Sequence, residues 1–324
     1  MVNQFDLKAA RAAAENMIIL PPRLVIHGEP GIGKSSFGAN APGCVFIKTE
    51  AGCDALGVPA LPVKGVCETW EQVLQAFDAV LDSPEGVQWI VLDSLNGAHQ
   101  LCRQYICDKD FGGTWVSKRG VEGYNAWAGG DKASAIEIKR LLAKADQARG
   151  QNIGIMMLGH TGLHKQGDAC GSDFYKFGMD MEPRSWAFVL QWADQVGHAC
   201  REFVTGKRDG ENRAKATMVN SERWLVFDGG PATDAKCRAG YDMPAKIILS
   251  FEEYQSKLSS PSAEVLRNQA LSLIADSDEK IKEIVKSKLA ASTAADVKKQ
   301  ISTMSLQRVQ TMVNWLIANN NKEG

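Results

Sequence analysis

The chain has no long run of apolar residues and no regular spacing of its cysteines. No run approaches the ~18–20 apolar residues that a membrane span requires. The eight cysteines include no C-x-x-C pair, which is typical of reduced thiols rather than of a disulfide framework. The N-terminus also lacks the apolar core of a secretory signal. The sequence therefore predicts a soluble, cytoplasmic protein with no membrane partner.

The chain also lacks an excess of charge of either sign. The chain has 37 Lys and Arg residues against 38 Asp and Glu residues, which gives a formal net charge of −1. Such a balance creates no global attraction for a polyanion, so any nucleic-acid contact must be a local patch. The spacing of His160, His164 and Cys170 matches no standard zinc pattern, which disfavours a metal cluster there.

The clearest motif that is present is G-x-x-x-x-G-K-[ST] at 28–35. A short apolar strand at 23–27 precedes it and a helical segment at 34–40 follows, which is the context of a phosphate-binding loop. In such a loop, backbone N–H groups hold phosphates, Lys34 reaches the β- and γ-phosphates, and the Ser35 hydroxyl holds Mg²⁺. The predicted ATP and Mg²⁺ contacts come from Gly28, Glu29, Pro30, Gly31, Ile32, Gly33, Lys34, Ser35 and Ser36.

A second landmark is Asp93, at the end of an apolar strand predicted at 88–92. Ligands sit at the carboxyl ends of parallel strands, so Asp93 is expected to complete the Mg²⁺ site beside Ser35. A helix N-cap is an alternative role that is compatible with the first. In many P-loop ATPases the next residue is a catalytic Glu, but here it is Ser94. The general base must therefore come from elsewhere, or hydrolysis is weak.

Two further polar residues end predicted strands at the same edge. Glu50 follows the strand at 44–48 and can orient a water molecule toward the γ-phosphate, although a solvated strand-end Glu is the alternative. His160 follows the strand at 153–158 and can report the γ-phosphate to the segment behind it. A structural hydrogen-bonding role is the alternative for His160. The predicted catalytic residues are thus Lys34, Glu50 and His160.

The order of segments predicts the architecture. Strands at 23–27, 44–48, 88–92 and 153–158 alternate with helices at 69–82, 95–108 and 132–148, which is typical of a parallel sheet with helices on both faces. The segment 161–182 is polar and contains glycines, so a loop is predicted there. Further strands at 193–202, 214–219, 223–228 and 246–251 suggest an antiparallel extension. The expected domains are an N-terminal helix (1–20), the core (21–257) and a helical C-terminal domain (258–324).

Together these residues resemble the RecA-like recombinase core, a P-loop NTPase fold. The strand ending Thr49-Glu50 resembles the one that carries the catalytic Glu in that family, and Asp93-Ser94 resembles its Walker B end. Gly159-His160 stands where the family places a γ-phosphate sensor. Phage-encoded, core-only RecA-like proteins, which are ATP-dependent single-strand annealing proteins, are similar over about 20–252, including Asp234-Ala-Lys-Cys-Arg238. The resemblance implies an α/β core with an antiparallel extension. The tail from 259, where apolar spacing predicts a small helical domain, lies outside the shared core.

Cations and flat side chains, which single-stranded DNA binding requires, occur in two predicted loops, 109–131 and 161–182. The resemblance implies that such loops line a DNA axis, while the alternative is that the aromatics pack beneath the loops. The predicted DNA contacts are Trp115, Lys118, Arg119, Lys165, Phe174, Tyr175 and Lys176.

RecA-like ATPases act as rings or filaments, which implies homo-oligomers with a residue supplied by the neighbour. Arg223 is the predicted trans-acting cation, and a solvated hairpin is the alternative. The leading hypothesis is an ATP-dependent protein for single-strand annealing or strand exchange, acting in the host cytoplasm and stimulated by DNA. The tail beyond 258 would then contact a single-strand DNA-binding protein or another recombination protein. The alternatives are a ring helicase or helicase loader, a nucleotide-controlled interaction protein and a small-molecule kinase.

Overall fold

The computed structural model describes residues 20–167, 171–206, 215–218, 221–238, 241, 243–258, 261–304, 309, 311–313 and 315–316. Two compact units divide the chain. The larger, which we call the core unit, comprises Leu20–Ala239 and Met243–Leu258, and the other contains the helices beyond Ser259. The N-terminal helix predicted at 1–20 lies, apart from Leu20, outside the described residues.

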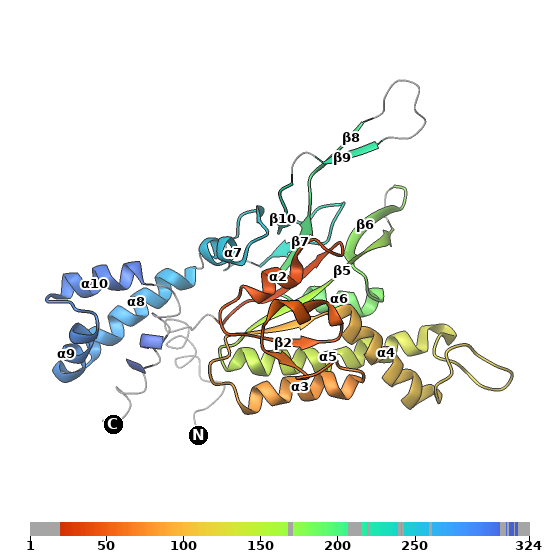
Figure 1. The fold of residues 1–324 in the computed structure, drawn as a ribbon, viewed down its shortest axis with the longest axis horizontal. Helices are drawn as coiled ribbons and strands as arrows, with labels where there is room; N and C mark the ends of the chain where they lie inside the picture. Colours follow the sequence, from red (N-terminus) through yellow and green to blue (C-terminus); the bar gives the residue numbers. More distant parts are fainter. Residues whose placement is uncertain are drawn as a thin grey trace. The chain divides into compact units, whose positions relative to one another are not determined.

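A twisted sheet forms the centre of the core unit (Figure 1). Its main path runs β12-β10-β7-β1-β5-β4-β2-β3. The six strands from β3 to β7 along this path are parallel, and β10 and β12 extend the sheet in antiparallel fashion. The bounds are β1 (Arg23–Gly28), β2 (Cys44–Lys48), β3 (Ala60–Leu61), β4 (Trp89–Asp93), β5 (Gly154–Gln166), β7 (Gln195–Cys200), β10 (Trp224–Val226), β11 (Lys236–Cys237) and β12 (Lys246–Ile248). The predicted α/β fold class, a mostly parallel central sheet with an antiparallel extension, is confirmed.

Helices cover both faces of this sheet (Figure 1). Alternate residues of each strand point to opposite faces, so Val25 packs with α3 to α6 while Leu24 and Ile26 pack with α2 and α7. The central strands are apolar on both sides for this reason. The helices are α2 (Lys34–Ala39), α3 (Trp70–Asp82), α4 (Leu95–Phe111), α5 (Gly129–Gly150), α6 (Pro183–Trp192) and α7 (Phe251–Lys257).

The segment predicted as a loop at 161–182 is a β-hairpin, so that prediction was wrong. β5 continues past His160 to Gln166 and pairs with β6 (Phe174–Met179) in antiparallel register. Glycine content suggested a loop, but Gly162 and Gly178 lie opposite each other and allow close packing: a Cβ on Gly178 would lie 2.7 Å from Asp234 Oδ2. The sequence also gave no indication of α6, and β7 runs parallel to β1 rather than in the antiparallel extension.

The C-terminal unit is mostly helical over its described residues beyond Ser259. It contains α8 (Pro261–Asp276), α9 (Glu279–Lys288) and α10 (Ala294–Thr303), with a capping box at the start of α10. Its buried cluster includes Ile281, Val285 and Ile301. Among the described residues, every helix of either unit is too short or too polar to cross a lipid bilayer.

Two buried histidines make the stability of the core unit depend on pH. Burial lowers the pKa of both His27 and His99 to about 4, compared with an ordinary value of about 6.5. Between these pH values the unfolded chain binds more protons than the folded chain, so acid favours unfolding. We therefore expect the free energy of unfolding to fall as the pH drops from about 6.5 to about 4. In His99→Leu the loss between pH 7 and pH 4.5, measured by denaturant titration, should be smaller by roughly 2 kcal/mol. An equal loss in both proteins would contradict this assignment.

Candidate nucleotide site

The phosphate loop connects β1 to α2 and has the curvature that its glycines permit. Gly31 and Gly33 adopt φ values of +75° and +112°, which residues with a Cβ rarely adopt. The loop curls around the Lys34 ammonium, which donates to the backbone oxygens of Gly28 (2.8 Å) and Glu29 (2.9 Å). Burial lowers the pKa of Lys34, with Asp93 as the first of the opposing charges. A cationic loop of this shape fits a polyphosphate.

Ser35 and Asp93 meet beside the loop. The Ser35 hydroxyl donates to Asp93 Oδ2 at 2.6 Å. Asp93 ends β4 and is almost buried, and this burial raises the pKa of its carboxyl against the Ser35 hydrogen bond. A hydroxyl and a carboxylate are hard oxygen donors of the kind that Mg²⁺ prefers. The residues predicted to hold Mg²⁺ therefore lie together and fit the ion.

Glu50 and His160 lie together at the same edge of the sheet. Glu50 Oε2 is 3.3 Å from His160 Nε2, and the Ser94 hydroxyl donates to Glu50 Oε1. Their side chains are 41% and 35% exposed, so the pair faces solvent rather than the core. The three predicted catalytic residues thus lie at the start of α2 (Lys34), just after β2 (Glu50) and within β5 (His160). Ser94 supports Glu50 instead of replacing the absent Glu.

Asn96, which the sequence did not single out, links His160 to the base of the hairpin. Its Oδ1 accepts from the His160 backbone N–H at 2.7 Å, and its Nδ2 donates to Asp180 O at 2.6 Å. The Asp180 N–H in turn donates to His160 O at 2.8 Å. The available signal was a polar residue three positions after Asp93 at the start of a helix.

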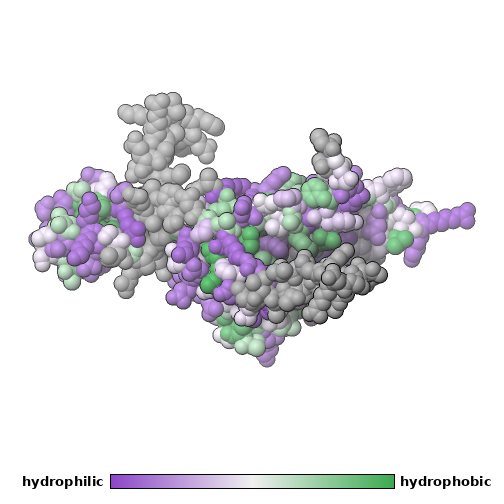
Figure 2. Space-filling model, turned by 90° about the horizontal axis from the view of Figure 1, so that it is seen from above, coloured by the Kyte–Doolittle hydropathy of each residue, from purple (hydrophilic) through white to green (hydrophobic). Residues whose placement is uncertain are grey.

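In the segment between α4 and α5, Trp115 is partly buried. Its ring lies 4.7 Å from the ring of Tyr124, which is fully buried, and the Arg103 guanidinium lies 5.6 Å from the Trp115 ring. Lys118 and Arg119 of this segment are exposed. The segment projects at the right of Figure 1, and the outer end of this projection is hydrophilic in Figure 2. In this segment the exposed tryptophan is Trp127, whose exposed fraction is 89%, rather than Trp115.

The predicted DNA contacts of the hairpin divide into paired cations and free aromatics. Lys165 pairs with Asp173 at 2.5 Å, and Lys176 pairs with Asp234 at 2.7 Å. Tyr175 is 61% exposed, whereas Phe174 is only partly exposed. Two apolar neighbours are also exposed on the hairpin, namely Leu163 (56%) and Phe177 (46%).

Arg223 lies against the phosphate loop of its own chain. A Cβ on Gly33 would lie 2.9 Å from Arg223 Nη1. Within the described part of the chain, the exposed guanidinium has no carboxylate partner. The sequence predicts that Arg223 acts on a neighbouring subunit, but its position also suits a nucleotide bound by the same subunit.

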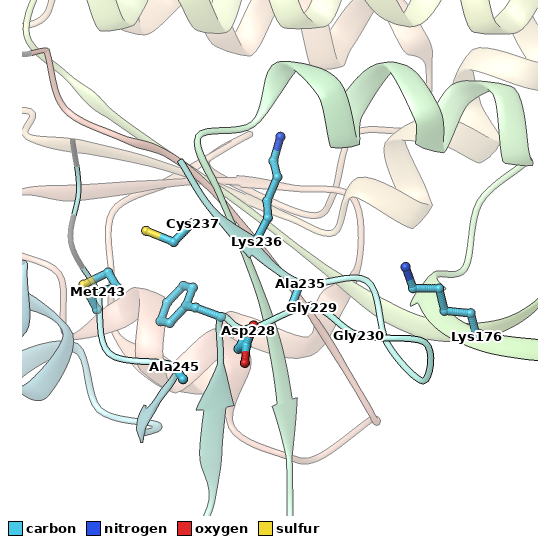
Figure 3. Close-up of a pocket in the computed structure, with 10 residues that line it drawn as sticks. Lys176, Asp228, Gly229, Gly230, Ala235, Lys236, Cys237, Met243 and Ala245 are labelled. Carbon is cyan, nitrogen blue, oxygen red and sulfur yellow. The ribbon is translucent and has the colours of Figure 1, made fainter. Parts of the chain in front are cut away.

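A cavity of about 650 Å³ lies elsewhere on the core unit, beside β10 and β11 (Figure 3). No residue of the phosphate loop lines it. Lys236 points away from Asp228, and Lys176 lies across the cavity from Met243. The polar side chains that line this cavity do not point toward one another. The candidate catalytic residues are therefore those near the phosphate loop.

The comparison with protein families agrees with a nucleotide site at the phosphate loop. The profile of a family described as AAA domain matches residues 20–239. No curated protein matches the chain. Among solved structures, the chain is similar to the flagellar accessory protein FlaH from Methanocaldococcus jannaschii, at 9% identity and a TM-score of 0.30. That match covers 75% of this chain and 96% of FlaH.

The position of Glu50 predicts that its carboxylate serves as general base. Glu50→Gln keeps the size of the side chain and an acceptor for Ser94 but cannot take a proton. We expect kcat for ATP hydrolysis to fall by roughly 10²–10⁴-fold, with ATP binding retained, as measured by a coupled phosphate-release assay and a fluorescent-ATP titration. Glu71→Gln, an exposed carboxylate of α3, is the matched control. Turnover in Glu50→Gln close to that of the control would contradict the assignment.

The position of Arg223 predicts that it acts within its own subunit. We expect Arg223→Ala to weaken ATP binding, while Arg184→Ala, which changes an exposed arginine of α6, leaves it unchanged. Mixing Arg223→Ala protein with Lys34→Ala protein separates the two modes of action. If Arg223 served the neighbour, Lys34→Ala subunits would restore ATPase activity to the mixture. We expect no restoration, and recovery of activity would instead support the trans role.

Proposed function

The chain belongs to the AAA-domain family, and on that premise we propose that this P-loop NTPase binds and anneals single-stranded DNA under the control of ATP. The observation that carries the proposal is the course of β5. This strand brings His160 to Glu50 and then continues, without a break, into a hairpin with exposed apolar and aromatic side chains. The nucleotide site and the proposed DNA surface therefore share one strand.

The nucleotide chemistry follows from the residues around the loop. When bound, Mg²⁺ would neutralise charge on the β- and γ-phosphates, held by Ser35 with Asp93 beside it. Lys34 would add a second cation, while Glu50 removes the proton of the attacking water. His160 contacts Glu50, so the same side chain can respond to the γ-phosphate and to its loss.

Exposed aromatic side chains support single-stranded DNA as the ligand. Stacking contributes roughly 1–3 kcal/mol per base and tolerates any sequence. Tyr175 and Phe177 offer such faces on the hairpin, and Trp127 offers one between α4 and α5. Trp127 has φ +52°, an unusual conformation for a bulky residue that is often found at functional positions.

The cations imply a moderate and salt-sensitive affinity. Lys118 and Arg119 are exposed, whereas Lys165 and Lys176 are neutralised by carboxylates. Contacts of Lys118 and Arg119 with DNA phosphates would release counterions from the DNA, so binding should weaken as the salt concentration increases.

The same proposal includes assembly and partners. Subunits would form a ring or filament along the DNA, as cooperative single-strand binders commonly do. The C-terminal unit carries several lysines on α9, one of which lies over the Trp315 ring at 4.7 Å. We propose that this unit contacts a single-strand DNA-binding protein or another recombination protein, in the cytoplasm of a phage-infected host.

The proposal predicts that single-stranded DNA stimulates ATP hydrolysis. We expect Trp127→Ala and Tyr175→Ala each to weaken binding of a fluorescent oligonucleotide by roughly 5–150-fold, which corresponds to the loss of one stacked base. Val63→Ala, at an exposed apolar residue after β3, is the control. An ATPase rate that does not respond to DNA would overturn the proposal, and unwinding of a tailed duplex would favour a helicase.

A further inference from the structure

We propose that Asp234, acting with His27, is a positioning residue that joins the phosphate loop to the β5–β6 hairpin. Asp234 begins the segment Asp234-Ala-Lys-Cys-Arg238, which the sequence singles out without a role. The inference rests on the proposed function only in treating the hairpin as a DNA-binding surface.

His27 is the first part of the connection. It directly precedes Gly28 and is fully buried. Each of its two ring nitrogens has a hydrogen-bond partner outside β1. Its Nε2 is 2.7 Å from the Asp234 backbone oxygen, and its Nδ1 is 2.9 Å from Thr161 Oγ1. Since a carbonyl oxygen can only accept, Nε2 carries the proton and Nδ1 accepts the Thr161 hydroxyl. The neutral ring is therefore satisfied at both nitrogens.

Asp234 is the second part, and it holds β6 in two ways. Its backbone N–H donates to Phe177 O at 2.7 Å. Its carboxylate pairs with Lys176 at 2.7 Å and accepts from Trp186 Nε1 at 2.8 Å. The Asp234 side chain is only 13% exposed, so these contacts are poorly screened by water. One residue thus links the end of β1 to both β6 and α6.

Close packing leaves little room for His27 to move independently. Its ring stacks on His198 at 4.8 Å, and Phe177 of the hairpin stacks on the same His198 ring at 6.1 Å. Because well-packed interiors transmit displacement rather than absorb it, movement at Gly28 should reach Thr161 and Asp234. The position of Asp234 then determines whether Lys176 faces its carboxylate or an incoming phosphate.

Asp234→Asn provides the test, with Asp173→Asn as the matched control. Asn at 234 keeps an acceptor for Trp186 and the backbone contacts but removes the charge facing Lys176. Asp173→Asn removes the other lysine–aspartate pair of the hairpin, whose side chains are 62% and 48% exposed. Amide hydrogen exchange of 161–166 and 174–179 is measured with and without AMP-PNP and Mg²⁺, in the absence of DNA.

We expect AMP-PNP to slow hairpin exchange by roughly 5–150-fold in the wild type and in Asp173→Asn, the range of typical coupling between sites. In Asp234→Asn this factor should approach 1, with AMP-PNP affinity preserved. Thr161→Val, which keeps the shape but removes the hydroxyl facing His27, should reduce the factor and provides the test if Asp234→Asn does not fold. A purely structural role would lower thermal stability without changing the nucleotide dependence.

The inference is overturned if AMP-PNP does not change hairpin exchange in the wild type, or if Asp234→Asn retains the full wild-type factor. Oligonucleotide binding is measured in parallel on the same proteins. Coupled exchange without DNA binding in any nucleotide state would overturn the proposed function and leave this inference supported. The two failures are therefore distinguishable.

Discussion

The pairing of β5 between β1 and β4 is the constraint on which the rest of the site depends. Its parallel register sets His160 opposite Gly28 and Leu158 opposite Asp93. Because the carboxyl ends of parallel strands meet at one edge, the phosphate loop, the Mg²⁺ ligands and the Glu50–His160 pair converge there. Two hydrogen bonds then hold β5 where it continues into the hairpin. One joins His160 to Asn96 of α4, and the other joins Thr161 to His27 of β1.

The consequence is that the candidate nucleotide site and the proposed DNA-binding hairpin lie on the same strand. The hairpin begins one residue after His160. It exposes Leu163, Tyr175 and Phe177, while both of its lysines are paired with carboxylates. Recognition by this surface should therefore depend more on stacking than on charge. That balance suits bases of a single strand better than the phosphates of a duplex.

Local sequence signals were sufficient for the fold class and for bringing the predicted catalytic residues to one edge of the sheet. The phosphate loop and the strands ending at Glu50, Asp93 and His160 carry apolar patterns that neighbouring strands reinforce. The hairpin was missed because its two opposed glycines are also typical of loops, whereas here Gly162 packs on Asp180 and Gly178 packs on Asp234. The sequence could not show which of Trp115 and Trp127 is exposed. Trp115 is partly buried because it packs on Tyr124, and this contact depends on how the segment folds back. Whether Arg223 lies near Gly33 depends on tertiary packing for the same reason.

The central claim is that ATP and single-stranded DNA bind to one coupled system. Coupling between ligands is reciprocal, so DNA must change the affinity for ATP by the same factor that ATP changes the affinity for DNA. The most direct measurement is the dissociation constant of AMP-PNP with Mg²⁺, determined calorimetrically with and without a saturating oligonucleotide. The account predicts tighter binding with DNA, by roughly 5–150-fold. Equal dissociation constants in the two titrations would contradict it.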